Sequence, residues 1–426
     1  MFMGVRSTLR ESVPEEASST SPFAQHRALL IVLAVGGFTS ALNVTLLSPL
    51  LVDIARTFDV SEAAAGQLAT LTAASSGVMA ITVAPWMDRY PRRFWLRLEC
   101  ALLTVGTLIS ALAPDFAWMF LGRAFAGIGG AVIGASCLAA CGDLFPDKGD
   151  RNRAIGLINS AFTLGAVVGL PIVTVAADWT DWRLAIALPA PLAALVFLGA
   201  TRLPATAGKR SGSMWEAWRG GYGRVFASRE TVWLLAAEIG FMIVWFGWLI
   251  YYGAFAENVY ATSAAVLSLM FLVGGGGELI ANNLAPVMMR RFPFRAIGYV
   301  ATAISSVNLL LIGIAYDQEW TLFPFIWIGS AMGATLLMCV SIALLDSLPC
   351  DPGAVMSLQS ACFELGGAIG VAVTGLALAV LDDYERTFQL LGAIMPIVAL
   401  LLWVSARRKT EAIGPDPHVA AAAGGK

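Results

Sequence analysis

The feature that most constrains this chain is a series of twelve apolar runs, most of them close to twenty residues long. A helix needs about twenty apolar residues to cross the hydrocarbon core of a bilayer. Only helices and closed barrels satisfy every backbone hydrogen bond in lipid, and runs of this length predict helices. The runs lie near residues 28–52, 65–86, 97–114, 117–141, 153–176, 184–201, 231–254, 264–288, 297–316, 321–345, 354–381 and 387–406. The sequence therefore predicts an all-α membrane protein with twelve transmembrane helices.

The composition is that of a membrane protein, and the polar segments outside the apolar runs are predicted to be two tails and a linker. The chain is 58% hydrophobic and 13% charged, whereas soluble domains carry about 25% charged residues. Residues 1–27 are predicted to be a disordered tail rather than a cleaved signal peptide, and residues 407–426 a second tail. The polar residues 202–230 are predicted to link a first helical unit, 28–201, to a second, 231–406. Four aromatic residues in this linker have helical spacing and predict an amphipathic helix at the membrane surface: Trp215, Trp218, Tyr222 and Phe226.

The distribution of Lys and Arg predicts how the chain is oriented. With both termini on the cytoplasmic side, cytoplasmic segments hold 23 of the 27 basic residues. Arg56, Arg183 and Arg386 fall in outer loops, and Arg123 falls inside a helix. Because basic residues concentrate in cytoplasmic loops, this asymmetry predicts cytoplasmic termini in a plasma membrane, such as a bacterial inner membrane.

Two halves of the sequence repeat each other. APWMDR at 84–89 recurs as APVMMR at 285–290, an offset of 201 residues. FTLGAVVG at 162–169 recurs as FELGGAIG at 363–370 with the same offset. The sequence therefore predicts two six-helix bundles in parallel orientation, related by an axis along the membrane normal. Transporters built this way bind their substrate between the halves, near the bilayer midplane.

The loop APWMDRYPRR resembles the signature G-x-x-x-D-R-x-G-R-R of the major facilitator superfamily. Asp88, Arg89, Arg92 and Arg93 match it, whereas Ala84 and Pro91 replace its two glycines. The resemblance implies a cytoplasmic charge latch formed by the four matching residues, which closes when the inner side is shut. The alternative is that the arginines form no latch and only contribute to the excess of basic residues in cytoplasmic loops.

Two further segments are similar to motifs of the same family. Residues 123–131 resemble R-x-x-Q-G-x-G-x-A, with Ala126 in place of the glutamine. Gly165, Gly169 and Pro171 resemble the antiporter signature G-x-x-x-G-P, with the proline displaced by one residue. These motifs resemble those of the twelve-helix drug/proton antiporter branch. They imply a secondary active transporter that exports small amphipathic or drug-like molecules by alternating access, coupled to protons.

Small residues predict where helices pack closely. Gly165 and Gly169, and their repeat partners Gly366 and Gly370, each lie four apart on one helix face. This spacing lets helix backbones approach each other. The run 274–277 consists of four glycines and is equally consistent with a flexible gate or with close packing. The repeat and the family resemblance together predict that helices 2 and 11, and helices 5 and 8, meet between the bundles.

Charged residues inside apolar runs are the sharpest functional signal, since each costs about 2.5–3.5 kcal/mol at a helix centre. A carboxyl away from water ionises less readily and can therefore exchange a proton near neutral pH. With both histidines in the tails, the candidate proton-coupling residues are Glu364, Glu278, Glu238 and Arg123. Each acid could instead make a structural hydrogen bond or ion pair. The candidate substrate-cavity residues are Asn43, Ser357 and Ser360.

Other functions remain open at this point. A uniporter or proton symporter for a sugar or organic acid is the main alternative, and sodium is a possible coupling ion. A membrane enzyme or sensor is disfavoured, because the sequence has no catalytic, metal or phosphate-binding motif and no long soluble segment. We expect no cofactor, no metal and no nucleic-acid partner. The expected partners are a small-molecule substrate, protons and the lipid bilayer, with the protein acting as a monomer.

Overall fold

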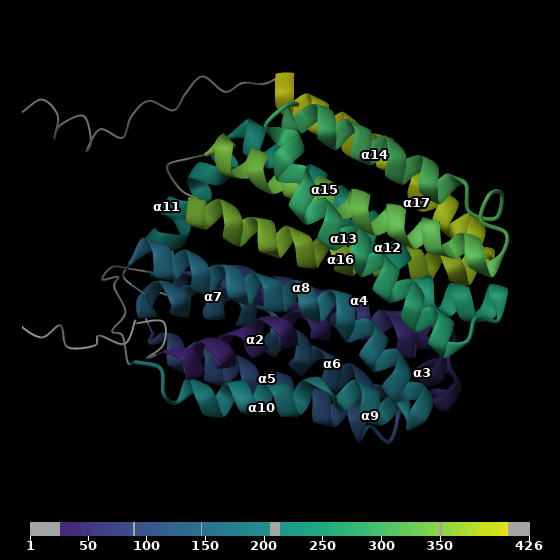
Figure 1. Ribbon diagram of the computed structural model, residues 1–426, viewed down its shortest axis with the longest axis horizontal. Coiled ribbons are helices and arrows are strands. Elements are labelled where there is room, and N and C mark those ends of the chain that lie inside the picture. The colour runs from purple at the N-terminus through teal and green to yellow at the C-terminus, as the bar shows by residue number, and fades with distance from the viewer. Residues whose placement is uncertain (1–25, 88–89, 146, 205–213, 349–351, 408–426) are drawn as a thin grey trace, which may run out of the picture.

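The computed structural model describes residues 26–87, 90–145, 147–204, 214–348 and 352–407. Within these ranges the chain folds into helices joined by short turns (Figure 1). The first half holds α2 (Arg27–Thr45), η1 (Ser48–Leu50), α3 (Leu51–Phe58), α4 (Glu62–Met87), α5 (Arg92–Ala111), α6 (Phe116–Gly130), α7 (Ile133–Leu144), α8 (Lys148–Trp179), α9 (Trp182–Ala187) and α10 (Pro189–Ala200). After the linker helix α11 (Met214–Ala227), the second half holds α12 (Arg229–Tyr260), α13 (Ala264–Met289), α14 (Phe294–Leu310), η2 (Glu319–Thr321), α15 (Leu322–Ser347), α16 (Pro352–Leu381) and α17 (Tyr384–Arg407).

The predicted helical membrane fold is confirmed, with local differences. Among the described residues, eleven helical segments are long and apolar enough to cross a bilayer, and α14 is a shorter apolar helix. The ninth run, predicted to reach residue 316, stops being helical after Leu310, because the chain turns there and Gly313 takes a left-handed φ of 71°. The fourth run is divided into α6 and α7, and the sixth into α9 and α10. In the second case the break falls just before Pro189, which cannot donate a backbone hydrogen bond.

Several helices begin at a polar residue whose side chain caps them. Asp115 accepts hydrogen bonds from two backbone N–H groups of α6, and Asp147 does the same for α8. Ser228 caps α12 and Ser263 caps α13. Such caps satisfy N–H groups that have no partner inside the helix. They fix where each long helix starts, although the apolar runs alone left these positions uncertain by a few residues.

The two halves use the same packing pattern. In the first half α2 packs against α8, and in the second half α12 packs against α16. Small residues allow both contacts: Gly165 lies against the Phe38 carbonyl of α2, and Gly370 against the Ile243 carbonyl of α12. Between the halves, α4 contacts α16 and α8 contacts α13. The prediction that helices 2 and 11, and helices 5 and 8, meet between the bundles is therefore confirmed.

The glycine run 274–277 serves close packing on both sides of α13. A Cβ atom at Gly275 would meet Val167 of α8, in the other half. At Gly274 it would meet Ile326 of α15, whereas at Gly276 there is open space. This helix therefore approaches α8 and α15 through glycines, which supports the packing interpretation of the run.

Apolar side chains also cover the outer surface of the molecule. Among the most exposed are Leu198 at 64%, Leu376 at 67% and Val380 at 73% of their full area. Exposed apolar surface on this scale would be unfavourable in water, but it is what a hydrocarbon environment requires. The core and the outer surface are both apolar, as expected of helices that cross a bilayer.

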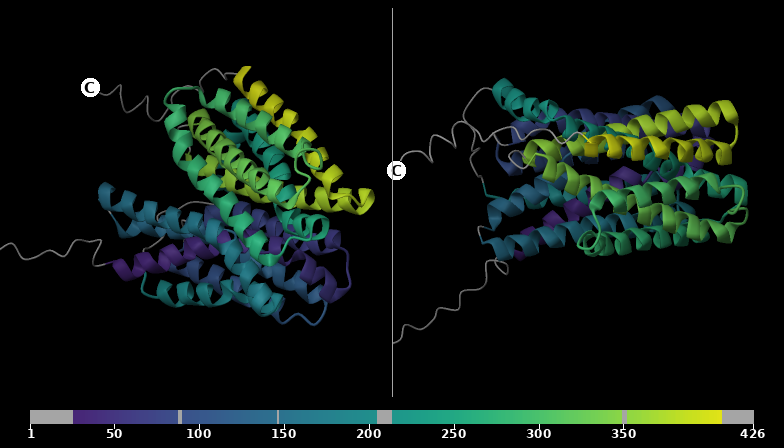
Figure 2. Two further views of the ribbon diagram at one scale, coloured as in Figure 1. Left: turned by 45° about the vertical axis from the view of Figure 1, so that its right-hand side comes forward. Right: turned by 90° about the horizontal axis from the view of Figure 1, so that it is seen from above.

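The halves meet at one end of the molecule and diverge at the other. The diverging end is where α2 begins and α17 ends, and we call it the terminal face (Figure 2). At the opposite end, the far face, Ser48 donates a hydrogen bond to the Leu249 carbonyl at 2.7 Å. Asn258 donates to Glu62 at 2.6 Å, and an ion pair between Arg56 and Glu257 measures 2.9 Å. All three contacts join the first half to the second, so the far face is closed.

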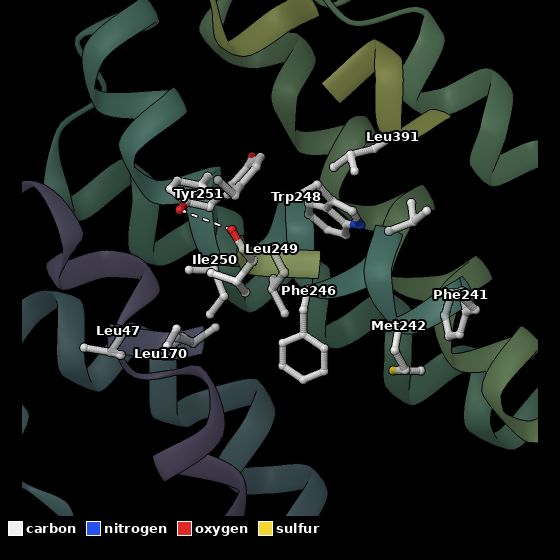
Figure 3. Close-up of a cluster of buried hydrophobic side chains, with 14 of the residues drawn as sticks. Leu47, Leu170, Phe241, Met242, Phe246, Trp248, Leu249, Ile250, Tyr251 and Leu391 are labelled. Carbon is white, nitrogen blue, oxygen red and sulfur yellow. Dashed lines mark hydrogen bonds between the residues drawn. The ribbon is translucent and has the colours of Figure 1, made fainter. Parts of the chain in front are cut away.

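Figure 3 shows part of a cluster of buried apolar side chains, many of them on α12. Tyr251 is fully buried, and its hydroxyl lies 3.5 Å from the Ala63 carbonyl of the first half and 3.4 Å from that of Val371. Leu47 and Leu170 of the first half belong to the same cluster. The packed cluster adds to the contacts that hold the two halves together toward the far face.

Candidate substrate cavity and coupling pocket

A cavity of about 410 Å³ lies between the halves. Its volume is within the range of small-molecule binding sites, roughly 300–1,000 Å³. From the first half, α2, α6, α7 and α8 contribute lining residues, and from the second half α12, α13, α15 and α16 do so. Its wall is mostly apolar and aromatic. The polar lining residues are Ser40, Thr45, Glu238, Glu278, Ser330, Ser341, Gln359, Ser360 and Glu364.

Helix breaks and glycines shape the first half's side of the cavity. Gly130, Ala131 and Gly134 line it at the point where α6 ends and α7 begins. The φ and ψ of Val132 in this break are −131° and 12°, outside the helical range. The break therefore presents small residues and irregular backbone to the cavity rather than a row of bulky side chains.

Three of the four predicted charged residues line this cavity. Glu238 comes from α12, Glu278 from α13 and Glu364 from α16. All three belong to the second half, which therefore carries every carboxyl among the described lining residues. Arg123 of α6 lies instead in a smaller space next to the cavity.

The smaller space, which we call the coupling pocket, has a volume of about 20 Å³, enough for one water molecule. Arg123 is fully buried there; its Nε donates to Thr72 at 3.1 Å and its Nη2 to the side chain of Asn43 at 3.4 Å. Its Nη1 has no hydrogen-bond partner among the described residues. Ser76 of α4 also lines the pocket, and its hydroxyl is hydrogen-bonded to Glu364.

Glu364 therefore borders both spaces, since it lines the cavity and the coupling pocket. It reaches the pocket because α16 packs tightly on α4, where a Cβ atom at Gly77 would touch Leu365. The pocket brings together an arginine and a carboxyl from opposite halves. Sequence spacing could not show this pairing, because only the packing of helices from opposite halves brings the two residues together.

The predicted cavity residues are distributed over different places. Ser360 lines the cavity. Asn43 lies in the coupling pocket, where it accepts from Arg123 and donates to the Ala126 carbonyl at 3.3 Å. Ser357 does not line the cavity, because its hydroxyl is 3.0 Å from that of Tyr222 in the linker helix α11, which packs on α16 near the terminal face.

The latch residues are only partly described. Asp88 and Arg89 lie outside the described residues. Arg92 forms an ion pair with Asp143 of α7 at 3.6 Å, inside the first half, and Arg93 is exposed. Both arginines lie at the terminal face, where the halves diverge.

Two buried polar residues were missed by the sequence analysis. Gln359 is 5% exposed, lines the cavity and donates to Ser341 at 2.7 Å. Glu99 is fully buried in the first half, where it accepts a hydrogen bond from Ser136 at 3.1 Å. Glu99 lies near the start of the apolar run predicted at 97–114, but α5 begins at Arg92, which places Glu99 two turns inside the helix. Starting the helix directly after the preceding loop, rather than where hydropathy rises, would have placed Glu99 inside the membrane helix.

Comparison with known proteins now identifies the family. The family model of the Major Facilitator Superfamily matches residues 33–354. The puromycin resistance protein pur8 of Streptomyces alboniger is 24% identical over 93% of this chain and 95% of its own length. A chloramphenicol efflux pump of Mycobacterium tuberculosis is 24% identical over 88% of this chain and 90% of its own length.

Two other comparisons are a partial sequence match and a match to a solved structure. The multidrug resistance protein Stp of Mycobacterium tuberculosis is 28% identical over 39% of this chain, and this match spans 31% of that protein. The crystal structure of a bacterial homologue of the human lysosomal transporter Spinster, inward-facing and unoccupied, superposes with a TM-score of 0.70. It has 17% identity and covers 91% of this chain and 98% of that one. The chain belongs to the Major Facilitator Superfamily, and it is a secondary membrane transporter with that family's two-bundle fold.

Proposed function

We propose that the protein is a proton-coupled exporter of small amphipathic or drug-like molecules that works by alternating access. Relatives named for puromycin resistance and chloramphenicol efflux support export as the direction. The positive-inside bias of the sequence supports a cytoplasmic terminal face in the plasma membrane. In that orientation the cavity is accessible from the cytoplasm, where an exporter collects its cargo, and a single chain supplies the whole cavity.

The observation that carries the proposal is the position of Glu364. This carboxyl borders the substrate cavity on one side and the coupling pocket, with Arg123, on the other. A residue in this position can respond both to cargo in the cavity and to its own state of protonation. An ionised Glu364 is attracted to the positive charge of Arg123 in the other half, and a protonated one is not.

The transport cycle follows from this arrangement. When the cavity is open to the cytoplasm, Glu364 releases its proton there and cargo enters. When the terminal face closes and the far face opens, cargo leaves and the carboxyl takes up a proton from outside. One proton thus moves inward as cargo moves outward. Glu278 and Glu238 are the other candidate proton sites, and Arg123 modulates the site that is used.

The cavity wall argues against a sugar as the cargo. A sugar presents hydroxyl groups in every direction, and each needs a hydrogen-bond partner when it is buried. Most described lining residues are apolar or aromatic, and the polar ones are a minority spread over α2, α12, α13, α15 and α16. An amphipathic molecule with an apolar body and one polar end fits this wall better than a sugar or an organic acid does.

The direction of the pH gradient tests the proposal in proteoliposomes that contain the purified protein. Chloramphenicol, which has no group titrating near neutral pH, and tetraphenylphosphonium, whose charge is permanent, avoid passive trapping of weak bases. Valinomycin with equal potassium on both sides clamps the membrane potential. An antiporter accumulates at least one of these probes when the lumen is acidic, because protons leave as the probe enters.

The reversed gradient separates the competing functions. A proton symporter accumulates the probe when the outside is acidic, and a uniporter equilibrates it under either gradient. Liposomes without protein, and liposomes treated with nigericin to remove the pH gradient, serve as controls. Accumulation only with an acidic exterior, or only equilibration, would contradict proton-coupled export.

A further inference from the structure

We infer that the cavity binds a cationic amphipathic molecule, and that Glu238, Gln359 and Ser341 form the subsite for its charged amine. This inference rests on the proposed export function and adds the chemical class of the cargo. The described residues that line the cavity include three carboxyls and no Lys, Arg or His side chain. Arg123 in the adjoining coupling pocket can compensate the charge of Glu364, whereas for Glu238 and Glu278 the described lining residues offer no cation, so protons or the cargo would supply it.

Glu238 is poorly satisfied by its protein neighbours. Glu238 is fully buried, and the amide nitrogen of Gln359 lies 3.5 Å from each of the two Glu238 carboxyl oxygens. These distances exceed the usual 2.7–3.2 Å of an N–H···O hydrogen bond. The same nitrogen makes a much shorter bond, 2.7 Å, to Ser341. A buried carboxylate without a close donor or cation is strongly unfavourable, so a cationic ligand would stabilise it.

The amide carbonyl of Gln359 adds a second acceptor to the subsite. Gln359 Oε1 is buried and has no hydrogen-bond partner among the described residues. Because Gln359 and Glu238 both line the cavity, the subsite offers carboxyl and carbonyl oxygens to a ligand. A protonated primary amine carries three N–H donors and no acceptor, which matches a group of acceptors better than a hydroxyl does.

Aromatic residues extend the subsite along the same face of α12. Phe241 and Trp245 follow Glu238 at three and seven residues, and all three line the cavity. The Phe241 and Trp245 ring centroids lie 5.8 Å apart. Trp245 packs directly over Gly333 of α15, where any Cβ atom would overlap its indole ring. The fixed ring faces can hold an apolar body and attract a nearby cation.

The subsite is separate from the coupling pocket. Glu364 is hydrogen-bonded to Ser76 of the first half and borders the space that contains Arg123. Glu238 does not line that space; its contact with Gln359, and the hydrogen bond from Gln359 to Ser341, remain within the second half. The structure thus assigns cargo recognition to Glu238 and leaves proton exchange to Glu364, with Glu278 as the alternative proton site.

A matched pair of ligands tests this assignment by binding, without any pH gradient. Naphthylbutylamine and naphthylbutanol share their apolar body and differ at one end, and naphthalene fluorescence reports their binding to the protein in nanodiscs after subtraction of empty nanodiscs. At pH 7 we expect the wild-type protein to bind the amine at least tenfold more tightly than the alcohol. Glu238→Gln should raise the Kd of the amine about tenfold and change that of the alcohol less than twofold.

Three further variants complete the test. Gln359→Met removes the free carbonyl and should weaken amine binding by a smaller factor, about threefold, so it tests the subsite even if Glu238→Gln fails to fold. Glu364→Gln should reduce the preference for the amine less than Glu238→Gln does. Asp317→Asn removes an exposed carboxylate from the connection between α14 and η2, outside the cavity lining, and should change neither Kd. Size-exclusion profiles and thermal stability establish that each variant is folded.

Several outcomes would overturn the inference. One is equal binding of amine and alcohol by the wild-type protein, or no saturable binding of either. Another is an equal loss of both ligands in Glu238→Gln, which would indicate a structural role. A third is loss of the amine preference in Glu364→Gln but not in Glu238→Gln. Because these measurements use no gradient, they can fail while antiport in proteoliposomes succeeds, and the reverse also holds.

Discussion

At the scale of single residues, the carboxyls of this protein differ in what surrounds them. Glu364 faces the other half, where Ser76 is its hydrogen-bond partner and Arg123 shares its pocket. Its repeat partner at the 201-residue offset is Thr163, whose hydroxyl donates to the Asn159 carbonyl of its own helix. A packing role common to both halves would not need an acid in only one of them, whereas proton exchange needs a single acid.

We therefore predict that Glu364→Gln abolishes accumulation driven by a pH gradient and reduces it to the level of protein-free liposomes. Glutamine has nearly the same shape and can accept a hydrogen bond from Ser76, but it cannot release a proton. Exchange of labelled for unlabelled probe without a gradient should persist, because binding and alternation do not require net proton movement. Glu278→Gln, measured in parallel, shows whether the effect is specific to Glu364. Full gradient-driven accumulation by Glu364→Gln would exclude this residue as the proton carrier.

The sequence predicts part of this site because a charge inside an apolar run is visible without a structure. Glu238, Glu278, Glu364 and Arg123 were all found in that way. Gln359 was not, since a neutral amide in a membrane helix gives only a weak signal. The contact between Glu364 and the Arg123 pocket also could not be predicted, because it depends on how α4 and α16 pack across the halves.

At the scale of helices, the sequence predicts number and order well and irregularities poorly. Hydropathy averages over about twenty residues and cannot detect the break between α6 and α7, which lines the cavity. Ser357 and Ser360 were both predicted to line the cavity, but Ser357 instead contacts Tyr222 of the linker helix α11. The spacing of the glycines was a better guide to helix packing, because a residue without a side chain lets a neighbouring helix approach at that position. Gly165 and Gly370 each lie against a backbone carbonyl of the neighbouring helix.

This close approach leads to a prediction about stability. A Cβ atom at Gly370 would collide with the Ile243 carbonyl of α12, so Gly370→Ala should force the helices apart and destabilise the protein by about 1–3 kcal/mol. Gly276→Ala is the matched control on α13, because no atom lies within 4 Å of the Cβ it would add. Alanine there should stabilise the helix by up to about 1 kcal/mol relative to glycine. Reversible unfolding in one detergent measures both variants, and equal stability of the two would contradict the packing argument.

At the scale of the whole molecule, the asymmetry between its two faces defines the state of the transporter. At the far face the two halves are joined by the hydrogen bonds from Ser48 to Leu249 and from Asn258 to Glu62, and by the buried cluster around Tyr251. At the terminal face the halves diverge (Figure 2). Alternating access requires that the far-face contacts be weak enough to break in every cycle. Exposed ion pairs meet this requirement, since each contributes only about 0.2–1 kcal/mol.

The ion pair between Arg56 and Glu257 provides a test of this idea. Arg56 is 66% exposed and joins α3 of the first half to α12 of the second, at 2.9 Å. Arg386, 73% exposed, pairs with Asp383 only three residues away, so its ion pair does not cross between the halves. We predict that Arg56→Gln increases the population open at the far face by roughly two- to fivefold, as expected for a loss of up to about 1 kcal/mol, whereas Arg386→Gln leaves it unchanged.

Spin labels measure this population as a distance across the far face. Exposed positions suitable for labels are Trp179 at the end of α8 and Trp320 in η2, in a background whose six native cysteines have been replaced. The population with the longer label-to-label distance should increase in Arg56→Gln, because this variant lacks the ion pair that helps to hold the far face closed. Salt screens the ion pair that the variant lacks. Raising the salt concentration should therefore move the wild-type distance distribution toward that of Arg56→Gln and leave the variant's distribution unchanged. If both arginine variants behave alike, or if salt acts equally on all three proteins, the Arg56–Glu257 pair has no part in holding the far face closed.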